Sequence, residues 1–206
     1  MSEAADVCRL YLVVPDAVPA PGPETFEAAL AGGDVACVLL EGTPAPATAQ
    51  ALCTAAQSRD VAVLIADDVA RAAALGADGV HLSRADGAAY RAARRRLGEN
   101  AIVGVAIDAG SRTVRHEAMV AGEWGADYVA FGERDSPPDP ALLAWWYEMM
   151  TLPCVAFGAT DLDTACDLAR AGADFVALDT WVWNHREGPG AAVAALERAL
   201  RDVHRP

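Results

Sequence analysis

Short apolar runs alternate with alanine- and leucine-rich amphipathic segments along the whole chain. A recurring phrase marks the junctions between them, in which small residues lead to Gly, then Asp, then an apolar run: AGGDVACVLL at 31–40, LGADGVHL at 75–82, WGADYVAF at 124–131 and AGADFVAL at 171–178. Glycine after a helical pattern accepts the left-handed conformation that ends a helix, and a short apolar run suits a strand buried on both faces. Each phrase therefore predicts the end of a helix and the start of a strand.

The spacing of the repeat predicts the fold class. Asp34, Asp78, Asp127 and Asp174 are separated by 44, 49 and 47 positions, about twice the length of one strand–helix unit, so a further strand and helix fit between copies. An α/β fold follows, a (βα)8 barrel of the TIM type that forms a single domain over residues 1–206. The predicted strands lie near 9–14, 35–41, 61–66, 78–82, 101–107, 127–132, 153–158 and 174–178.

An open, doubly wound sheet is the alternative architecture. The chain has no GxGxxG after its first strand and no GxxxxGK[ST], the phosphate loops typical of open nucleotide-binding sheets, which favours the barrel. Its 206 residues, 53% hydrophobic, suit one well-buried domain rather than a disordered chain.

Composition also limits the partners. No apolar run is long enough to span a bilayer and the N-terminus lacks a secretory signal, so we expect a soluble, cytoplasmic protein with no membrane partner. A net charge of -13 argues against nucleic acid. Five cysteines without any CxxC pair indicate reduced core residues rather than zinc ligands or disulfides.

Barrel enzymes bind their ligands at the carboxyl ends of the strands. Carboxylates dominate those positions here, and such crowding favours a bound divalent cation beside a small-molecule ligand. The candidate ligand contacts are Arg84, Arg134, Asp68, Asp108, Glu133 and Trp181.

Asp67 and Asp86 are the candidate metal ligands, because each follows one of two neighbouring strands and two carboxylates with retained waters commonly hold Mg²⁺ beside a phosphate. Aspartate is also a favoured N-cap residue, and the spacing alone favours the interpretation of Asp67 or Asp68, and of Asp86, as caps of the helices that follow. The two roles are compatible.

A phosphate site is expected after the seventh strand, at Gly158, Ala159 and Thr160, where a glycine permits close backbone approach. A tight turn followed by an N-cap is the alternative there. The four histidines form no site by their spacing, and His81, inside the fourth strand, is interpreted as structural.

Six segments spread over nearly the whole chain are similar to those of one known family: RLYLVVPD at 9–16, AVLIADDVARAAALGADGVHLSRAD at 62–86, AIVGVAIDA at 101–109, GADYVAFGERD at 125–135, PCVAFGAT at 153–160 and GADFVAL at 172–178. In these segments the chain resembles, in register, the thiamine phosphate synthase and TenI superfamily. The resemblance implies a barrel that joins thiazole phosphate to hydroxymethylpyrimidine diphosphate, releasing pyrophosphate with magnesium. It also raises the expectation of a homodimer.

The resemblance assigns roles to individual positions. Asp67 matches the aspartate of the family's Asn-Asp-Arg motif and Asp86 the last residue of its Gly-Gln-Glu-Asp motif, which are the family's magnesium ligands. Gly158 matches the first glycine of the seventh-strand Gly-Gly motif, which helps to bind the thiazole phosphate, and Ala159 replaces the second.

The chain departs from the family where basic groups grip the pyrophosphate. Residues 38–43 supply no basic side chain, Ala66 and Asp68 replace Asn and Arg, Ala106 replaces a serine, and 132–140 contains no lysine. Losing one such group typically costs on the order of a hundredfold in rate. We therefore expect a divergent synthase-like protein that lacks most of its pyrophosphate clamps, or alternatively a degenerate barrel that binds a small metabolite or divalent metal.

Overall fold

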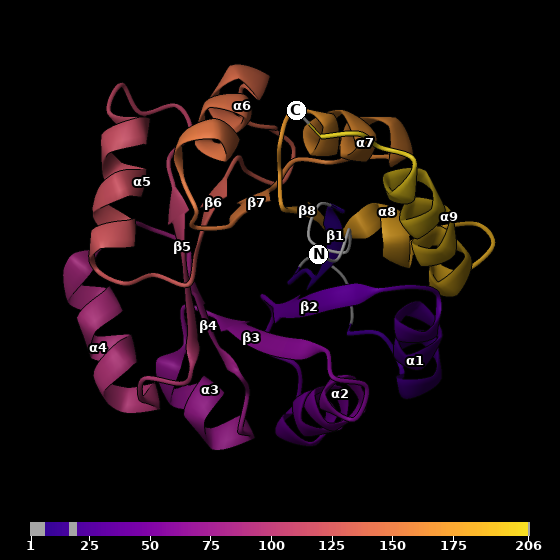
Figure 1. The fold of residues 1–206 in the computed structure, drawn as a ribbon. Coiled ribbons are helices and arrows are strands. Elements are labelled where there is room, and N and C mark those ends of the chain that lie inside the picture. The colour runs from indigo at the N-terminus through magenta and orange to yellow at the C-terminus, as the bar shows by residue number, and fades with distance from the viewer. Residues whose placement is uncertain (1–6, 17–19, 206) are drawn as a thin grey trace, which may run out of the picture.

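A computed structural model describes residues 7–16 and 20–205. Within these residues, eight parallel strands pair in sequence order and close into a barrel in which β1 (Arg9–Val14) lies beside β8 (Phe175–Leu178). Helices surround the barrel (Figure 1). The predicted (βα)8 TIM barrel is confirmed, and the alternative of an open sheet is wrong.

The elements follow the predicted alternation, and every predicted strand boundary is correct to within two residues. The other strands are β2 (Val35–Leu40), β3 (Ala62–Ala66), β4 (Gly79–Leu82), β5 (Ile102–Ile107), β6 (Tyr128–Phe131) and β7 (Cys154–Ala156). The helices are α1 (Pro23–Ala31), α2 (Pro46–Gln57), α3 (Val69–Leu75), α4 (Gly87–Leu97), α5 (Val114–Glu123), α6 (Pro140–Met149), α7 (Leu162–Arg170), α8 (Thr180–Trp183) and α9 (Pro189–Arg201).

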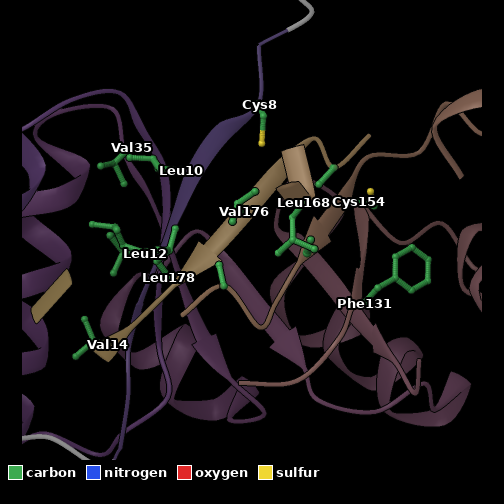
Figure 2. Packing of buried hydrophobic residues seen from close by; sticks show 14 of the residues in the cluster. Cys8, Leu10, Leu12, Val14, Val35, Phe131, Cys154, Leu168, Val176 and Leu178 are labelled. Carbon is green, nitrogen blue, oxygen red and sulfur yellow. The ribbon is translucent and has the colours of Figure 1, made fainter. Parts of the chain in front are cut away.

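The apolar strands bury side chains on both faces, because successive side chains of a strand point to opposite sides. In β1, Leu10, Leu12 and Val14 belong to the large cluster between barrel and helices, part of which Figure 2 shows, whereas Tyr11 and Val13 belong to a second cluster inside the barrel. Burying such a side chain stabilises the fold by roughly 1.5–3 kcal/mol. All five cysteines are buried as well, as their apolar surroundings predict.

The repeated aspartate has a structural role that its spacing alone does not reveal. In three of the four copies its carboxylate accepts a hydrogen bond from a backbone N–H of the preceding strand: Asp78 from Val63, Asp127 from Val103 and Asp174 from Cys154, at 2.8, 2.7 and 2.8 Å. In the first copy, Asp34 instead forms an ion pair with Arg9 at the start of β1 (2.7 Å). The repeat thus ties the strands together in pairs at the amino-terminal end of the barrel.

The glycine of the repeat takes the predicted left-handed conformation at Gly76, Gly125 and Gly172, where φ is 63°, 91° and 111°. The prediction is wrong for the first copy, because Gly32 is right-handed, with φ of -71°. A side chain at Gly32 would place its Cβ only 2.4 Å from the carbonyl oxygen of Gly190, so this position needs glycine for the close approach of α9. In the described part of the chain, no helix combines the length and apolarity needed to cross a membrane.

The aspartate contacts predict an asymmetry between two copies of the repeat. Asp78→Ala should lower the free energy of unfolding by about 1–3 kcal/mol, because it leaves the Val63 N–H without its acceptor. Asp34→Ala removes an exposed ion pair and should cost at most about 1 kcal/mol. Urea denaturation followed by circular dichroism measures the free energy of unfolding of both variants. Equal losses would show that the hydrogen bond to the Val63 N–H stabilises the fold no more than the exposed ion pair does.

Candidate functional site

A cavity of about 650 Å³ opens at the carboxyl ends of β2 to β7, and we call it the mouth cavity. Ala66, His81, Ala106 and Phe157 line it together with charged residues of the following loops. The charged lining comprises Arg84 and Arg134 against the carboxylates Glu41, Asp67, Asp108, Glu117 and Glu133. The predicted acidic mouth is therefore present, and it is an open space rather than one filled by side chains.

A second cavity, of about 640 Å³, lies beside the first, over the loops that follow β7 and β8. Thr160, Asp179 and Trp181 line it, and Trp181 packs edge-on against His185, with ring centroids 5.0 Å apart. Arg134 lines both cavities. Its side chain therefore stands at the boundary between two spaces on the same face of the barrel.

Asp67 is held rigidly at the edge of the mouth cavity. Its φ of 55° is unusual for a residue other than glycine. Its backbone N–H donates to the carbonyl of His81 (2.9 Å), and its Oδ1 accepts from the Ser83 N–H (2.8 Å). Both bonds join the end of β3 to the end of β4 and leave Oδ2 without a hydrogen bond to any described residue.

Asp86 and Asp68 are N-caps, as the cap interpretation predicts. Asp86 Oδ1 accepts from the N–H groups of Ala88 and Ala89 (2.7 and 3.3 Å), and Asp68 accepts from Arg71 N–H (2.8 Å). Neither Asp68 nor Asp86 lines the mouth cavity, although the preceding Ala85 does. The second oxygen of Asp86 makes no hydrogen bond to the described residues, so capping leaves it able to bind a cation.

The oxygen atoms of Asp67 and Asp86 are compatible with the predicted metal site, which stays a prediction. Within residues 7–16 and 20–205, no three His, Cys, Asp or Glu side chains come together as a metal-binding group. Mg²⁺ commonly binds one or two carboxylates and keeps several waters, so the free oxygens of Asp67 and Asp86 would suffice.

Arg134 is presented by a tight turn after β6, in which Glu133 and Ser136 exchange backbone hydrogen bonds of 2.9 and 3.0 Å. From there its guanidinium donates to both Glu41, after β2, and Asp179, after β8. Burial raises the pKa of Glu41 above its usual value, and Arg134 opposes that shift. The arginine therefore holds three rim loops together.

The three residues of the predicted phosphate loop have different environments in the structure. Gly158 is left-handed, with φ of 94°, and an added Cβ would lie 2.5 Å from the backbone nitrogen of Pro137. This position therefore needs glycine for the close approach of the loop after β6. Ala159 is buried, and Thr160 is the one residue of the three that lines the second cavity.

The remaining predicted contacts Asp108, Glu133 and Arg84 all line the mouth cavity. Asp108 also accepts a hydrogen bond from Gly110 N–H (2.9 Å) within its own loop. Arg84 is exposed and forms no ion pair within the part of the chain that the structure describes. It is thus the cation most readily available to a ligand.

Sequence reasoning missed two features of this face. Arg71, on α3, donates to the carbonyls of Gly42 and Pro44 (2.9 and 3.0 Å) and so places a cation beside the loop after β2, where the sequence shows no basic residue. Glu117, on α5, reaches the mouth cavity from the helix rather than from a strand end. Both lie on helices, where an exposed charge looks like ordinary surface.

The model of the family described as thiamine monophosphate synthase matches residues 10–180. A thiamine-phosphate synthase of Rhodospirillum centenum is 48% identical over 208 residues, covering 94% of this chain and 98% of the relative. Another, of Hyphomonas neptunium, is 39% identical and covers 95% of each chain.

Solved structures show the same fold. The thiamine phosphate pyrophosphorylase of Pyrococcus furiosus superposes with a TM-score of 0.78 over 97% of this chain and 98% of its own, at 23% identity. The (S)-3-O-geranylgeranylglyceryl phosphate synthase of Thermoplasma acidophilum gives a TM-score of 0.69 at 16% identity, over 96% and 94% of the two chains.

The position of Arg134 predicts a pH-dependent loss of stability. Arg134→Met leaves the half-buried Glu41 carboxylate facing Asp179, which raises the pKa of Glu41 further above its unfolded value. A carboxyl group with a raised pKa in the folded state loses stabilisation as the pH rises through that interval. The variant should therefore be about 1 kcal/mol less stable than the wild type at pH 7 and nearly as stable at about pH 4, in urea denaturation at both values.

Arg186→Met is the matched control, because Arg186 pairs with Glu187 on the exposed surface. It should change stability little at either pH. A constant difference between Arg134→Met and wild type across this range would contradict the account.

Proposed function

Because the chain belongs to the thiamine monophosphate synthase family, we propose that it joins thiazole phosphate to hydroxymethylpyrimidine diphosphate and releases pyrophosphate. The observation that supports this proposal most directly is the pair of adjoining cavities at the carboxyl end of the barrel, separated by Arg134. Two substrates that must meet need two neighbouring spaces, and a free carboxylate oxygen of Asp67 lies at one while the exposed Thr160 lies at the other.

The diphosphate is assigned to the mouth cavity together with Mg²⁺. Five carboxylates and two arginines line this cavity, so a diphosphate without a cation would be repelled. Asp67 and Asp86 are the residues that would hold the ion. When bound, Mg²⁺ supplies positive charge that stabilises the departing pyrophosphate.

Two arginines could supplement that charge. Arg84 is free to contact a phosphate without breaking an ion pair among the described residues, whereas Arg134 must exchange Glu41 or Asp179 for the ligand. We therefore assign the first phosphate contact to Arg84 and a later contact, as the two substrates come together, to Arg134. The thiazole phosphate is assigned to the second cavity, beside Thr160.

A second candidate function is ligand binding without synthesis. The observation that favours it is the excess of carboxylates in the mouth cavity, combined with the occupation of Arg134 by two of them. In that case the barrel would hold a divalent metal or a small metabolite but would form no thiamine phosphate. Action in the cytoplasm and assembly as a homodimer stay predictions under either function.

The test is formation of thiamine phosphate from the two substrates by the purified protein with Mg²⁺. Asp67→Asn should lower kcat/KM by about a hundredfold or more, because it removes a charged metal ligand. Asp68→Asn is the matched control: it changes the neighbouring carboxylate, which lies outside the cavity, and asparagine caps helices as well as aspartate does. It should retain activity within about threefold.

Two results would count against the proposal. No product above the rate without protein would leave only the binding function. Equal activity in Asp67→Asn and Asp68→Asn would remove Asp67 from the site.

A further inference from the structure

A chain of buried polar groups runs along the inside of the barrel to the floor of the mouth cavity. The hydroxyl groups of Tyr11 and Tyr128 lie 2.8 Å apart, and the Tyr128 hydroxyl lies 2.8 Å from Nδ1 of His81. All three residues are at most 6% exposed. The rings of Tyr128 and Phe157 pack against the imidazole, at centroid distances of 5.8 and 5.6 Å, so the histidine is fixed in orientation.

The other imidazole nitrogen, Nε2, faces the ligand space. His81 lines the mouth cavity, its Nδ1 is occupied by Tyr128, and Nε2 makes no hydrogen bond to any described residue. Among the described residues, the sole fully buried side-chain nitrogen or oxygen without a partner is Nε of Arg205. Because His81 is absent from that group, its Nε2 has a surface open to the cavity.

The protonation states of the chain are set by burial. All three groups are buried, and no charged side chain of the described residues donates to them or accepts from them. Burial without a charged partner favours the uncharged form of each group, a neutral imidazole and two protonated phenols. A neutral imidazole has one N–H and one acceptor nitrogen, so the direction of the hydrogen bonds decides which of them faces the ligand.

The direction of these hydrogen bonds follows from the groups at the two ends of the Tyr11–Tyr128–His81 chain. If Nδ1 carried the proton, the last hydroxyl, on Tyr11, would have to donate toward the thiol of Cys37, its partner in the β1–β2 register, and sulfur is a weak acceptor. The lone pair of Nε2 would also face an acidic cavity that contains Asp67. In the opposite direction, each phenol donates to a good acceptor and an N–H faces the carboxylates, so this direction is favoured.

We propose that Tyr128, supported by Tyr11, is a positioning residue that holds His81 in the Nε2–H tautomer, so that the floor of the mouth cavity offers the ligand a fixed, uncharged hydrogen-bond donor. Such a donor recognises a lone pair on the ligand and adds no charge to the site. Its effect on catalysis rests on the proposed function, whereas the tautomer itself does not.

Nuclear magnetic resonance of the ¹⁵N-labelled protein without substrate tests the tautomer. The His81 signals are identified by their loss in His81→Asn. In the wild type at pH 7, Nε2 should show the shift of a protonated nitrogen, and Nδ1 the shift of an unprotonated nitrogen moved upfield by a hydrogen bond. In Tyr128→Phe, the Nδ1 signal should move downfield or average with that of Nε2.

Two variants serve as controls. Tyr11→Phe removes the outer hydroxyl alone, so the tautomer should persist and the Nδ1 shift should stay closer to the wild-type value than in Tyr128→Phe. Tyr90→Phe removes a tyrosine hydroxyl from α4, where it donates to the Gly125 carbonyl, and should leave the His81 signals unchanged. A protonated Nδ1 in the wild type, or an Nδ1 shift unaffected by Tyr128→Phe, would overturn the proposal.

The kinetic consequence is measured separately. Tyr128→Phe should lower kcat/KM for thiamine phosphate formation about tenfold, the effect of losing one well-placed hydrogen bond, while Tyr90→Phe stays within about threefold of wild type. A wild-type protein without synthase activity would contradict the proposed function and leave the tautomer to be decided by the resonance experiment. Full activity in Tyr128→Phe of an active enzyme would overturn the positioning role.

Discussion

The hydrogen bond from a strand's backbone N–H to the aspartate of the repeat is the constraint on which the site depends. Parallel strands in a closed barrel have no hairpins to fix their relative position, so register has to be set by other contacts. Asp78, Asp127 and Asp174 each fix the start of one strand against its neighbour. Because the strands are short, from three residues in β7 to six in β1, fixing the amino-terminal ends also determines which residues reach the mouth cavity.

The alternation of strands and helices was predictable from the sequence, because the chain has to end a helix and begin a buried strand at each junction. A helix that ends on glycine and a strand buried on both faces leave a local pattern, and four copies of it, spaced at about twice the length of one strand–helix unit, predict a barrel of eight units. The exception at Gly32 arises from a tertiary contact with Gly190, which no local pattern records. The rim carboxylates were predictable for the same reason, since they directly follow the strands.

The contacts that organise the site were not predictable, because they join residues that are far apart in the sequence. Arg134 pairs with Glu41, 93 positions away, and His81 contacts Tyr128, 47 positions away. Gly158 also makes a contact that its sequence neighbours do not record, because an added Cβ would lie 2.5 Å from the backbone nitrogen of Pro137 in the preceding loop. The sequence pattern thus predicts which charged side chains lie at the mouth cavity. It does not predict which of them form ion pairs with one another.

The rim of this site carries charged side chains, whereas the proposed hydrogen-bond donor on its floor is uncharged. Under the proposed function, the acidic rim needs a cation before it can accept a diphosphate, whereas the proposed role of the buried His81 is directional recognition without charge. Isothermal titration of the wild-type protein with pyrophosphate, with and without Mg²⁺, tests this central claim most directly. The account predicts binding with Mg²⁺ and none without it; equal binding in both conditions, or none in either, would contradict it.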